Sequence, residues 1–198
     1  MLNKFRVLLK PVIELLGNSF ASLGLSANVW TICGMLSSMV SALLYASAVP
    51  SIGLTRYNAT ILGGIVLLIS GFFDIVDGTV ARVTKSSSRK GSFLDSSLDK
   101  LSEVAVFLGL AIGDLVEPLL CMIALSLSLI VSYIRARAES LGIELKGIGI
   151  GERAERLLIL ALIGMIPIPG AMQWAVVIVS IIAGITIVHR MVVTYKKL

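Results

Sequence analysis

Four aspartates within one short stretch are the residues of this chain best suited to chemistry. Asp74 and Asp77 stand three positions apart, and Asp95 and Asp99 stand four apart. Residues at these spacings share one face of a helix. The segment between the two pairs contains the small, polar run TKSSSRKG. The sequence therefore predicts two helices that fold back as a hairpin and bring all four carboxylates together.

Such a cluster needs compensating positive charge. Each ionised carboxylate inside the hydrocarbon costs about 2.5–3.5 kcal/mol, and neighbouring carboxylates repel one another. Ligand sets made only of oxygen suit Mg²⁺ or Mn²⁺, and two such ions suit a phosphoryl-type displacement. The cluster therefore predicts a site for divalent cations shared by several aspartates. Gly78, which has no side chain, would let a phosphate or nucleotide approach the backbone closely.

Two other interpretations of the aspartates remain open. The carboxylates could pair with basic residues at a solvated helix end, where Arg82, Lys85 and Lys100 are available. They could also line an ion pathway in a divalent metal-ion transporter, since intramembrane carboxylates mark such pathways. The transporter is disfavoured because the other apolar stretches carry almost no acidic residue at mid-membrane depth.

The apolar stretches around this block predict an all-α integral membrane protein. Of the 198 residues, 57% are hydrophobic and 15% charged, whereas soluble domains carry about 25% charge. A membrane-crossing helix needs about 20 mostly apolar residues. We expect six transmembrane helices, over residues 28–48, 59–82, 93–112, 116–134, 156–168 and 171–188.

The N-terminal segment predicts a different kind of helix. Residues 2–16 carry apolar side chains at helical spacing, with Lys4, Arg6 and Lys10 elsewhere. This pattern is typical of an amphipathic helix that lies in the membrane interface. We therefore divide the chain into an N-terminal interfacial helix, residues 1–20, and a six-helix transmembrane catalytic domain, residues 21–198. Cys33 and Cys121 lie in apolar runs and are expected to be core residues.

Basic residues predict how the protein sits in the membrane. With six crossings, 16 of the 17 Lys and Arg residues fall on one side, and only Arg56 falls on the other. The positive-inside rule then puts both termini and the carboxylate block on the cytoplasmic side of the cell membrane. Nucleic-acid binding is disfavoured because no basic stretch is interleaved with aromatic residues. Trp30 and Trp174, near predicted helix ends, could be interfacial anchors or packing residues.

The aspartate block fits the pattern D-x2-D-G-x2-A-R-x8-G-x3-D-x3-D at every fixed position: Asp74, Asp77, Gly78, Ala81, Arg82, Gly91, Asp95 and Asp99. This pattern resembles the signature of the CDP-alcohol phosphotransferase family. The resemblance implies six transmembrane helices, an interfacial N-terminal helix and a homodimer. It also implies a transferase of phospholipid biosynthesis, which moves the lipid phosphoryl group of CDP-diacylglycerol or CDP-archaeol to an alcohol and releases CMP.

The resemblance also implies roles for single residues. Asp74, Asp77, Asp95 and Asp99 would hold two divalent cations, Mg²⁺ or Mn²⁺. Asp99 would be the catalytic general base for the incoming hydroxyl, in addition to binding metal. Contacts with the CDP group are implied for Asp77, Gly78, Ala81 and Arg82.

The stretch LSANVWT is similar to the family's Pro-Asn-x-x-Thr segment. This similarity implies that Asn28 and Thr31 also reach the nucleotide. The sequence departs from the family in having Ala27 where proline is common. Asn28 could instead be a simple helix N-cap.

An arginine cluster indicates that the acceptor alcohol carries a phosphate. The guanidinium group donates two parallel hydrogen bonds to phosphate, and the candidates are Arg135, Arg137, Arg153, Arg156 and Arg190. The stretches SYIRARAE and GERAERLL resemble those of the phosphatidylinositol-phosphate and archaetidylinositol-phosphate synthases, which implies inositol 1-phosphate as acceptor. A glycerol-phosphate acceptor is the alternative. The arginines could also merely contact lipid headgroups or form helix-end pairs, such as Glu152 with Arg156.

Overall fold

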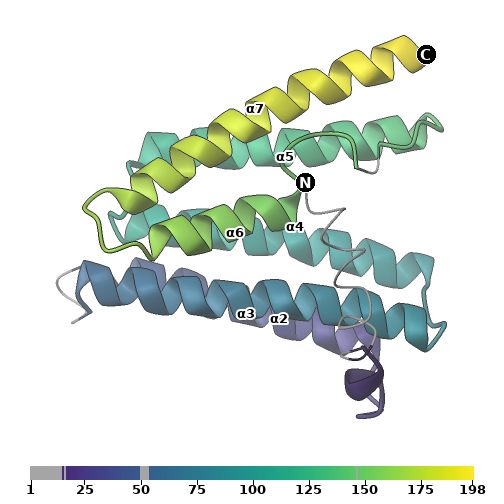
Figure 1. Ribbon diagram of the computed structural model, residues 1–198, viewed down its shortest axis with the longest axis horizontal. Coiled ribbons are helices and arrows are strands. Elements are labelled where there is room, and N and C mark those ends of the chain that lie inside the picture. The colour runs from purple at the N-terminus through teal and green to yellow at the C-terminus, as the bar shows by residue number, and fades with distance from the viewer. Residues whose placement is uncertain (1–14, 16, 50–53, 146) are drawn as a thin grey trace.

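All regular secondary structure in the described part of the chain is helical. The computed structural model describes residues 15, 17–49, 54–145 and 147–198. Within them, successive long helices run back and forth along one direction (Figure 1). The helices are α2 (Ala27–Ala46), α3 (Arg56–Val83), α4 (Arg89–Ile112), α5 (Pro118–Ser140), α6 (Arg153–Gly164) and α7 (Ala171–Lys197). The predicted all-α class is confirmed for these residues.

Four of the helices are long and apolar enough to cross a membrane: α2, α3, α5 and α7. Helix α4 has the length, but it carries four charged residues near its middle, Asp95, Asp99, Lys100 and Glu103. Helix α6 has 12 residues, which span only about 18 Å. The chain is therefore a membrane protein, while six crossings remain a prediction. Two helices also continue past their predicted ends, α5 to Ser140 and α7 to Lys197.

Large apolar side chains cover the outside of these helices. Leu43 on α2 is 70% exposed and Met122 on α5 is 65% exposed, a surface suited to lipid rather than water. Trp174, at the start of α7, is also exposed, as expected of an interfacial anchor. Trp30 is buried instead and stacks on Phe73, with Phe20 against its edge. Trp30 is therefore a packing residue.

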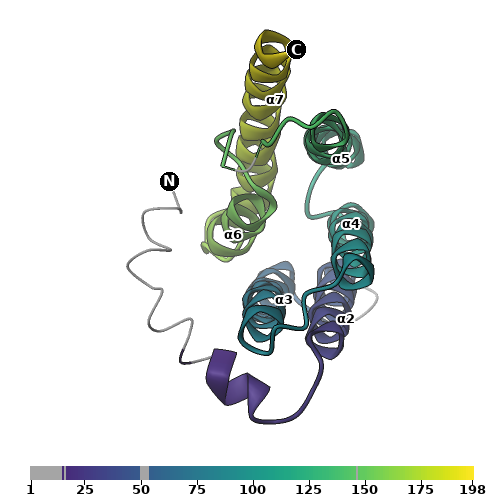
Figure 2. The ribbon, with the colours of Figure 1, turned by 90° about the vertical axis from the view of Figure 1, so that its right-hand side faces the viewer.

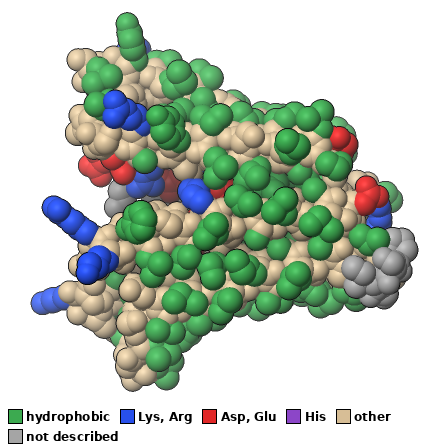
Figure 3. Space-filling model, turned by 180° about the vertical axis from the view of Figure 1, so that it is seen from behind, with side chains coloured by type: hydrophobic (Ala, Val, Ile, Leu, Met, Phe, Trp, Pro, Cys, Tyr) green, Lys and Arg blue, Asp and Glu red, His purple; other side chains and the backbone are tan. Residues whose placement is uncertain are grey.

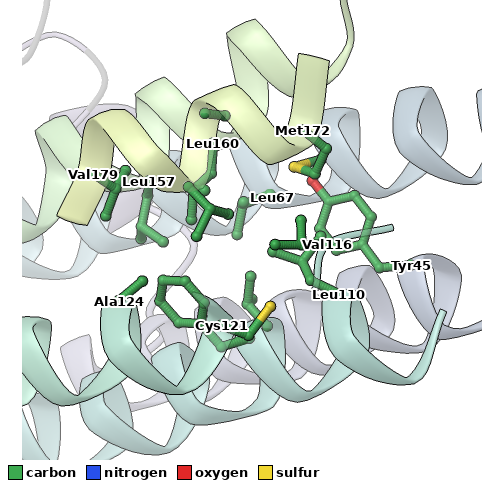
Figure 4. Close-up of a cluster of buried hydrophobic side chains, with 14 of the residues drawn as sticks. Tyr45, Leu67, Leu110, Val116, Cys121, Ala124, Leu157, Leu160, Met172 and Val179 are labelled. Atoms are coloured by element: carbon green, nitrogen blue, oxygen red, sulfur yellow. The ribbon is translucent and has the colours of Figure 1, made fainter. Parts of the chain in front are cut away.

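The helices pack as two connected groups, seen end-on in Figure 2. Helix α2 lies against both α3 and α4, and α5 lies against α7. Helix α6 joins the groups because it contacts both α3 and α7. The main core lies between them and contains Tyr45, Leu110, Cys121, Leu160 and Val179 (Figure 4).

Small residues let α2 approach its neighbours closely. A Cβ added at Gly109 of α4 would lie 2.3 Å from the Ala42 carbonyl oxygen, and one at Gly63 of α3 would lie 2.5 Å from the Tyr45 ring. The Ser38 and Ser70 hydroxyls form a buried hydrogen bond of 2.6 Å between α2 and α3. Close approach of small residues and interhelical hydrogen bonds are the main sources of helix association in lipid.

The predicted interfacial helix falls largely outside the described residues. Residues 17–21 are helical, and residues 1–14 and 16 are not described. The division into an interfacial segment and a catalytic domain therefore remains a prediction. At the end of the bundle where α3 begins, Arg56 forms an ion pair with Asp114, just after α4.

Replacing Gly109 by alanine should destabilise the bundle, because the new methyl group collides with the α2 backbone. We expect a loss of about 1–3 kcal/mol, measured as a lower midpoint of thermal unfolding in detergent. Gly71→Ala is the matched control, since no atom of the described residues, its own helix turn aside, lies within 4 Å of a Cβ at this glycine. It should be neutral or stabilise by about 0.5–1 kcal/mol. Equal midpoints for the two variants would contradict the close packing of α2 on α4.

Candidate functional site

A short connection sets the two aspartate-bearing helices side by side. Helix α3 ends at Val83 and α4 begins at Arg89. Ser88 caps α4 by accepting a hydrogen bond of 3.0 Å from the Gly91 N–H. The Ser86 N–H donates back to the Ala81 carbonyl at 3.0 Å. The predicted hairpin is confirmed, and it brings the end of α3 next to the start of α4.

The hairpin gathers the predicted aspartates. Asp74, Asp95 and Asp99 each offer a carboxylate oxygen that lies within 4.8 Å of the other two. Asp77 is 6% exposed and lies close enough to Asp74 and Asp95 for their charges to interact. Figure 3 shows Lys and Arg side chains gathered at one end of the molecule, around a hollow in which acidic side chains are visible. Negative charge is thus concentrated within a basic rim.

The donor set fits a divalent cation. It consists of carboxylate oxygens, which hard cations prefer. Two of these oxygens, Asp77 Oδ2 and Asp95 Oδ1, are buried and have no hydrogen-bond partner among the described residues. Buried carboxylate oxygens without partners are costly, and coordination to a cation would remove that cost.

Arg153 supplies part of the compensating charge. Its Nη1 atom lies 3.0 Å from Asp74 Oδ1 and 2.6 Å from Asp99 Oδ1. The guanidinium therefore bridges α3 and α4 from the start of α6. Lys100, one of the basic residues predicted as a partner, also places its positive charge near Asp95 and Asp99. The sequence predicted Arg153 as a ligand of the acceptor phosphate, but in the structure it contacts the aspartates.

Two of the residues expected to contact nucleotide, Asn28 and Thr31, come from the start of α2. Thr31, Asp74, Asp77 and Asp99 line one small cavity. The side-chain oxygen of Asn28 lies 3.2 Å from the position of a Cβ at Gly91. Asn28 is not an N-cap, because α2 begins at Ala27 and Ser26 takes the cap position.

The end of α3 presents an open backbone face beside this cavity. A Cβ at Gly78 would meet only Arg82 Nη1, at 3.6 Å. Arg82 is exposed, and its Nη2 donates to the Thr79 hydroxyl at 2.9 Å. Ala81 is half-buried. Nothing bulky therefore blocks this face within the described residues.

The predicted acceptor arginines separate into distinct environments. Arg190 is buried, and its Nε and Nη1 donate to the carbonyls of Ile148 and Val131 at 2.8 and 2.9 Å. Arg135 pairs with Glu139 at 2.8 Å, and its charge interacts with that of Arg190. Arg137 lies apart, lining an apolar groove of about 460 Å³ between α5 and α7.

A buried ion pair that the sequence did not predict lies one helical turn beyond Asp99. Arg156 Nη2 and Glu103 Oε1 are 2.8 Å apart, and both side chains are almost wholly buried. Arg156 Nη1 also donates to the Gly151 carbonyl at 2.9 Å. The spacing of Asp95, Asp99 and Glu103 by four could have signalled this third acidic position. Arg156 thus joins α6 to α4, and the predicted pair with Glu152 is not its main contact.

The glycine-rich segment before α6 is fastened to α7. The Thr186 hydroxyl accepts hydrogen bonds from the N–H groups of Ile150 and Gly151, at 3.3 and 3.2 Å. A Cβ at Gly151 would lie 2.2 Å from the Ile182 side chain. Gly149 has a φ of 121°, which a residue with a side chain rarely adopts. These contacts fix the start of α6, and thereby the position of Arg153.

Comparison with known proteins places the chain in one family. The family described as CDP-alcohol phosphatidyltransferase matches residues 25–193. The archaetidylinositol phosphate synthase of Pyrococcus horikoshii is 35% identical, covering 100% of this chain and 98% of that protein. The enzyme of the same name from Methanothermobacter thermautotrophicus is 36% identical, over 100% and 96%.

A solved structure agrees with the sequence relatives. The phosphatidylinositol phosphate synthase of Mycobacterium tuberculosis, solved with CDP-DAG bound, superposes with a TM-score of 0.77. It is 28% identical, and the match covers 93% of this chain and 94% of that one. A second structure of that enzyme, in complex with manganese and citrate, gives a TM-score of 0.76, over 92% and 88% of the two chains.

Substituting Glu103 by glutamine should strongly destabilise the protein, because it leaves the Arg156 charge buried without a partner. We expect a loss of about 3–5 kcal/mol, read as a lower unfolding midpoint in detergent. Glu139→Gln removes a carboxylate from an exposed pair, so its expected cost is about 0.5 kcal/mol or less. The double variant Glu103→Leu with Arg156→Leu should lose less than Glu103→Gln. If Glu103→Gln melts like Glu139→Gln, the buried pair does not hold α6 to α4.

Proposed function

The chain belongs to the CDP-alcohol phosphatidyltransferase family, and on this premise we propose that it transfers the lipid phosphoryl group of a CDP-lipid to inositol 1-phosphate and releases CMP. The observation that carries the proposal is the convergence of Asp74, Asp95 and Asp99 beside an arginine-bearing helix end. The choice of acceptor draws its support from relatives named archaetidylinositol phosphate synthase, which this chain matches over its whole length.

The cofactors we propose are two divalent cations, Mg²⁺ or Mn²⁺, with four ligand residues: Asp74, Asp77, Asp95 and Asp99. When bound, the cations would polarise the CDP-lipid phosphates and stabilise the leaving oxygen of CMP. The partnerless oxygens of Asp77 and Asp95 support this proposal, as does the manganese complex of the related mycobacterial enzyme.

Asp99 is the residue we propose as general base. The acceptor hydroxyl oxygen forms a bond to the lipid-bearing phosphorus, and the bond from this phosphorus to the CMP oxygen breaks. The hydroxyl proton passes to a carboxylate oxygen of Asp99, which must lie within hydrogen-bond reach. Its place in the aspartate cluster, next to Arg153, supports this role because Arg153 is a proposed ligand of the acceptor phosphate.

The CDP group would lie against the open face at the end of α3 and the start of α2. Its proposed ligands are Asn28, Thr31, Asp77, Gly78, Ala81 and Arg82. The open space beside Gly78 would admit the diphosphate, and the exposed Arg82 guanidinium could neutralise it. The CDP-DAG complex of the mycobacterial relative supports a CDP-lipid as donor.

The acceptor phosphate would bind in the arginine cluster at the same end of the bundle. Arg153, Arg190 and Arg135 are our preferred ligands. The interacting charges of Arg190, Arg135 and Arg156 support a local positive field. Arg156 would act mainly through its pair with Glu103. Arg137, in the groove between α5 and α7, is the weakest of the candidates.

For the membrane arrangement, we propose that α4 and α6 complete six crossings and that the active site faces the cytoplasm. The basic residues at one end of the bundle support this orientation. Family membership supports a homodimer.

Two alternatives make different demands on the protein. Glycerol phosphate as acceptor would also use a phosphate pocket, so only a direct comparison of acceptors separates it from inositol 1-phosphate. A metal-ion transporter would need a polar path across the bilayer, and the family assignment argues against that class.

Inositol 1-phosphate should be the acceptor that releases CMP fastest. Purified protein with CDP-lipid and Mg²⁺ or Mn²⁺ would be given inositol 1-phosphate, free inositol, glycerol 3-phosphate or serine, with CMP release as the measurement. We expect free inositol to be slower by about 100-fold or more, because the arginines of the acceptor site would lack their anionic partner. Faster turnover with glycerol 3-phosphate would overturn the proposed acceptor.

Asp99→Asn should lose turnover while still binding CDP-lipid. The amide cannot accept the hydroxyl proton, and general-base catalysis contributes about 10²–10⁴-fold. CMP release gives the rate, and equilibrium binding of CDP-lipid checks that the site persists. Asp114→Asn, at the opposite end of the bundle, is the control and should keep its rate. Metal flux through liposomes without CMP release would instead identify a carrier.

A further inference from the structure

Arg153 occupies the space between carboxylates that a divalent cation would need. One atom, Nη1, contacts Asp74 Oδ1 on α3 and Asp99 Oδ1 on α4, at 3.0 and 2.6 Å. Both aspartates belong to the trio whose oxygens lie within 4.8 Å of one another. A guanidinium hydrogen-bonded to two carboxylates uses the same lone pairs that would ligate a metal ion.

We propose that Arg153 is a built-in competitor of the divalent cation, and that its transfer from the aspartates to the acceptor phosphate couples cation loading to acceptor binding. The coupling part rests on the function proposed above. The competition part depends only on the cation and the protein, because it concerns one side chain and the two carboxylates that it contacts.

The Arg153 side chain has a hydrogen-bond donor to spare for a further partner. Its Nε is buried with no hydrogen-bond partner among the described residues, so its present contacts leave a donor unused. The side chain is 15% exposed, and it stands at the first position of α6. Movement of the guanidinium therefore requires rotation about side-chain bonds only.

The backbone beneath Arg153 is fixed by contacts that do not involve the aspartates. Three residues further along α6, Arg156 is held by Glu103 and by the Gly151 carbonyl. The preceding segment is held to α7 through Thr186. Helix α6 therefore stays in place while the Arg153 guanidinium exchanges partners.

Electrostatics drives the exchange in one direction. A divalent cation on Asp74 and Asp99 brings twice the charge of Arg153 to the same oxygens and repels the guanidinium. The positive charges of Arg153 and Arg156 already repel that of Lys100 in this region. The displaced guanidinium therefore needs an anion, and a phosphate offers it two parallel hydrogen bonds. By linkage, phosphate must then strengthen cation binding by the same factor with which the cation strengthens phosphate binding.

The competition is tested by titrating the purified full-length protein with Mn²⁺ and following free Mn²⁺ by electron paramagnetic resonance, with no substrate present. Arg153→Gln should bind Mn²⁺ about tenfold more tightly than the original protein, because the competing charge is gone. Arg153→Lys keeps a competing charge and should stay within about threefold. Arg56→Gln, which removes the same charge from the exposed pair with Asp114, is the control and should change nothing.

Equal or weaker Mn²⁺ binding by Arg153→Gln would overturn the competition. Should that variant fail to fold, Arg153→Met provides the same comparison, and circular dichroism establishes which variant is folded.

The coupling is tested by repeating the Mn²⁺ titration with inositol 1-phosphate. The phosphate should tighten Mn²⁺ binding severalfold in the original protein and leave Arg153→Gln unchanged. If Arg153→Gln binds Mn²⁺ more tightly but the phosphate has no effect on the original protein, the proposed acceptor fails and the competition stands. If the phosphate tightens binding equally in both proteins, Arg153 is not the coupling residue.

Discussion

Negative charge crowded at one end of an apolar bundle is the constraint around which the rest of the molecule is arranged. Asp74, Asp95 and Asp99 converge from two helices, with the buried Asp77 on the same helix as Asp74, and repulsion among these carboxylates must be offset. Arg153 offsets part of it by bridging α3 and α4. The position of α6 follows from this requirement, since α6 carries that arginine to the aspartates.

The ion pair of Glu103 with Arg156 holds α6 where Arg153 can reach the aspartates. Two ion pairs join α4 to α6. Asp99 with Arg153 is the outer pair, and Glu103 with Arg156 lies one helical turn deeper. The deeper pair is buried, whereas the side chains of the outer pair are partly exposed. A fixed inner contact can hold the helix while the outer side chain meets substrate and cation. This division between support and chemistry is what a precise site requires.

Lipid surroundings explain why small residues decide how these helices pack together. Apolar side chains gain little by leaving lipid for another apolar surface, so helices associate where their backbones fit closely. Gly109 against Ala42 and Gly63 against Tyr45 provide such fits on both sides of α2. They hold α2, with Asn28 and Thr31 at its start, beside the hairpin that carries the aspartates. Gly151 against Ile182 serves α6 in the same way.

Local pattern and chemistry by themselves determined the helical class, the apolar spans and the α3–α4 hairpin. They could do so because helical periodicity, span length and turn residues act over a few neighbouring positions. The convergence of Asp74, Asp95 and Asp99 followed from the same local spacing, whereas Asp77 lies outside that trio. The sequence also indicated that α4 would be charged, but it did not indicate that its third acidic position, Glu103, would be buried.

Tertiary structure alone decided which partners Arg153, Arg156 and Arg190 meet. The sequence does not tell the five arginines of the predicted cluster apart. In the structure Arg135 pairs with Glu139 on its own helix, and Arg137 lines an apolar groove. Arg153 contacts the aspartates, Arg156 pairs with Glu103, and Arg190 donates to backbone carbonyls. Their helices α5, α6 and α7 are brought together only by packing between segments far apart in the chain. A long, flexible side chain takes its partner from whatever that packing sets within reach, and no local pattern encodes this.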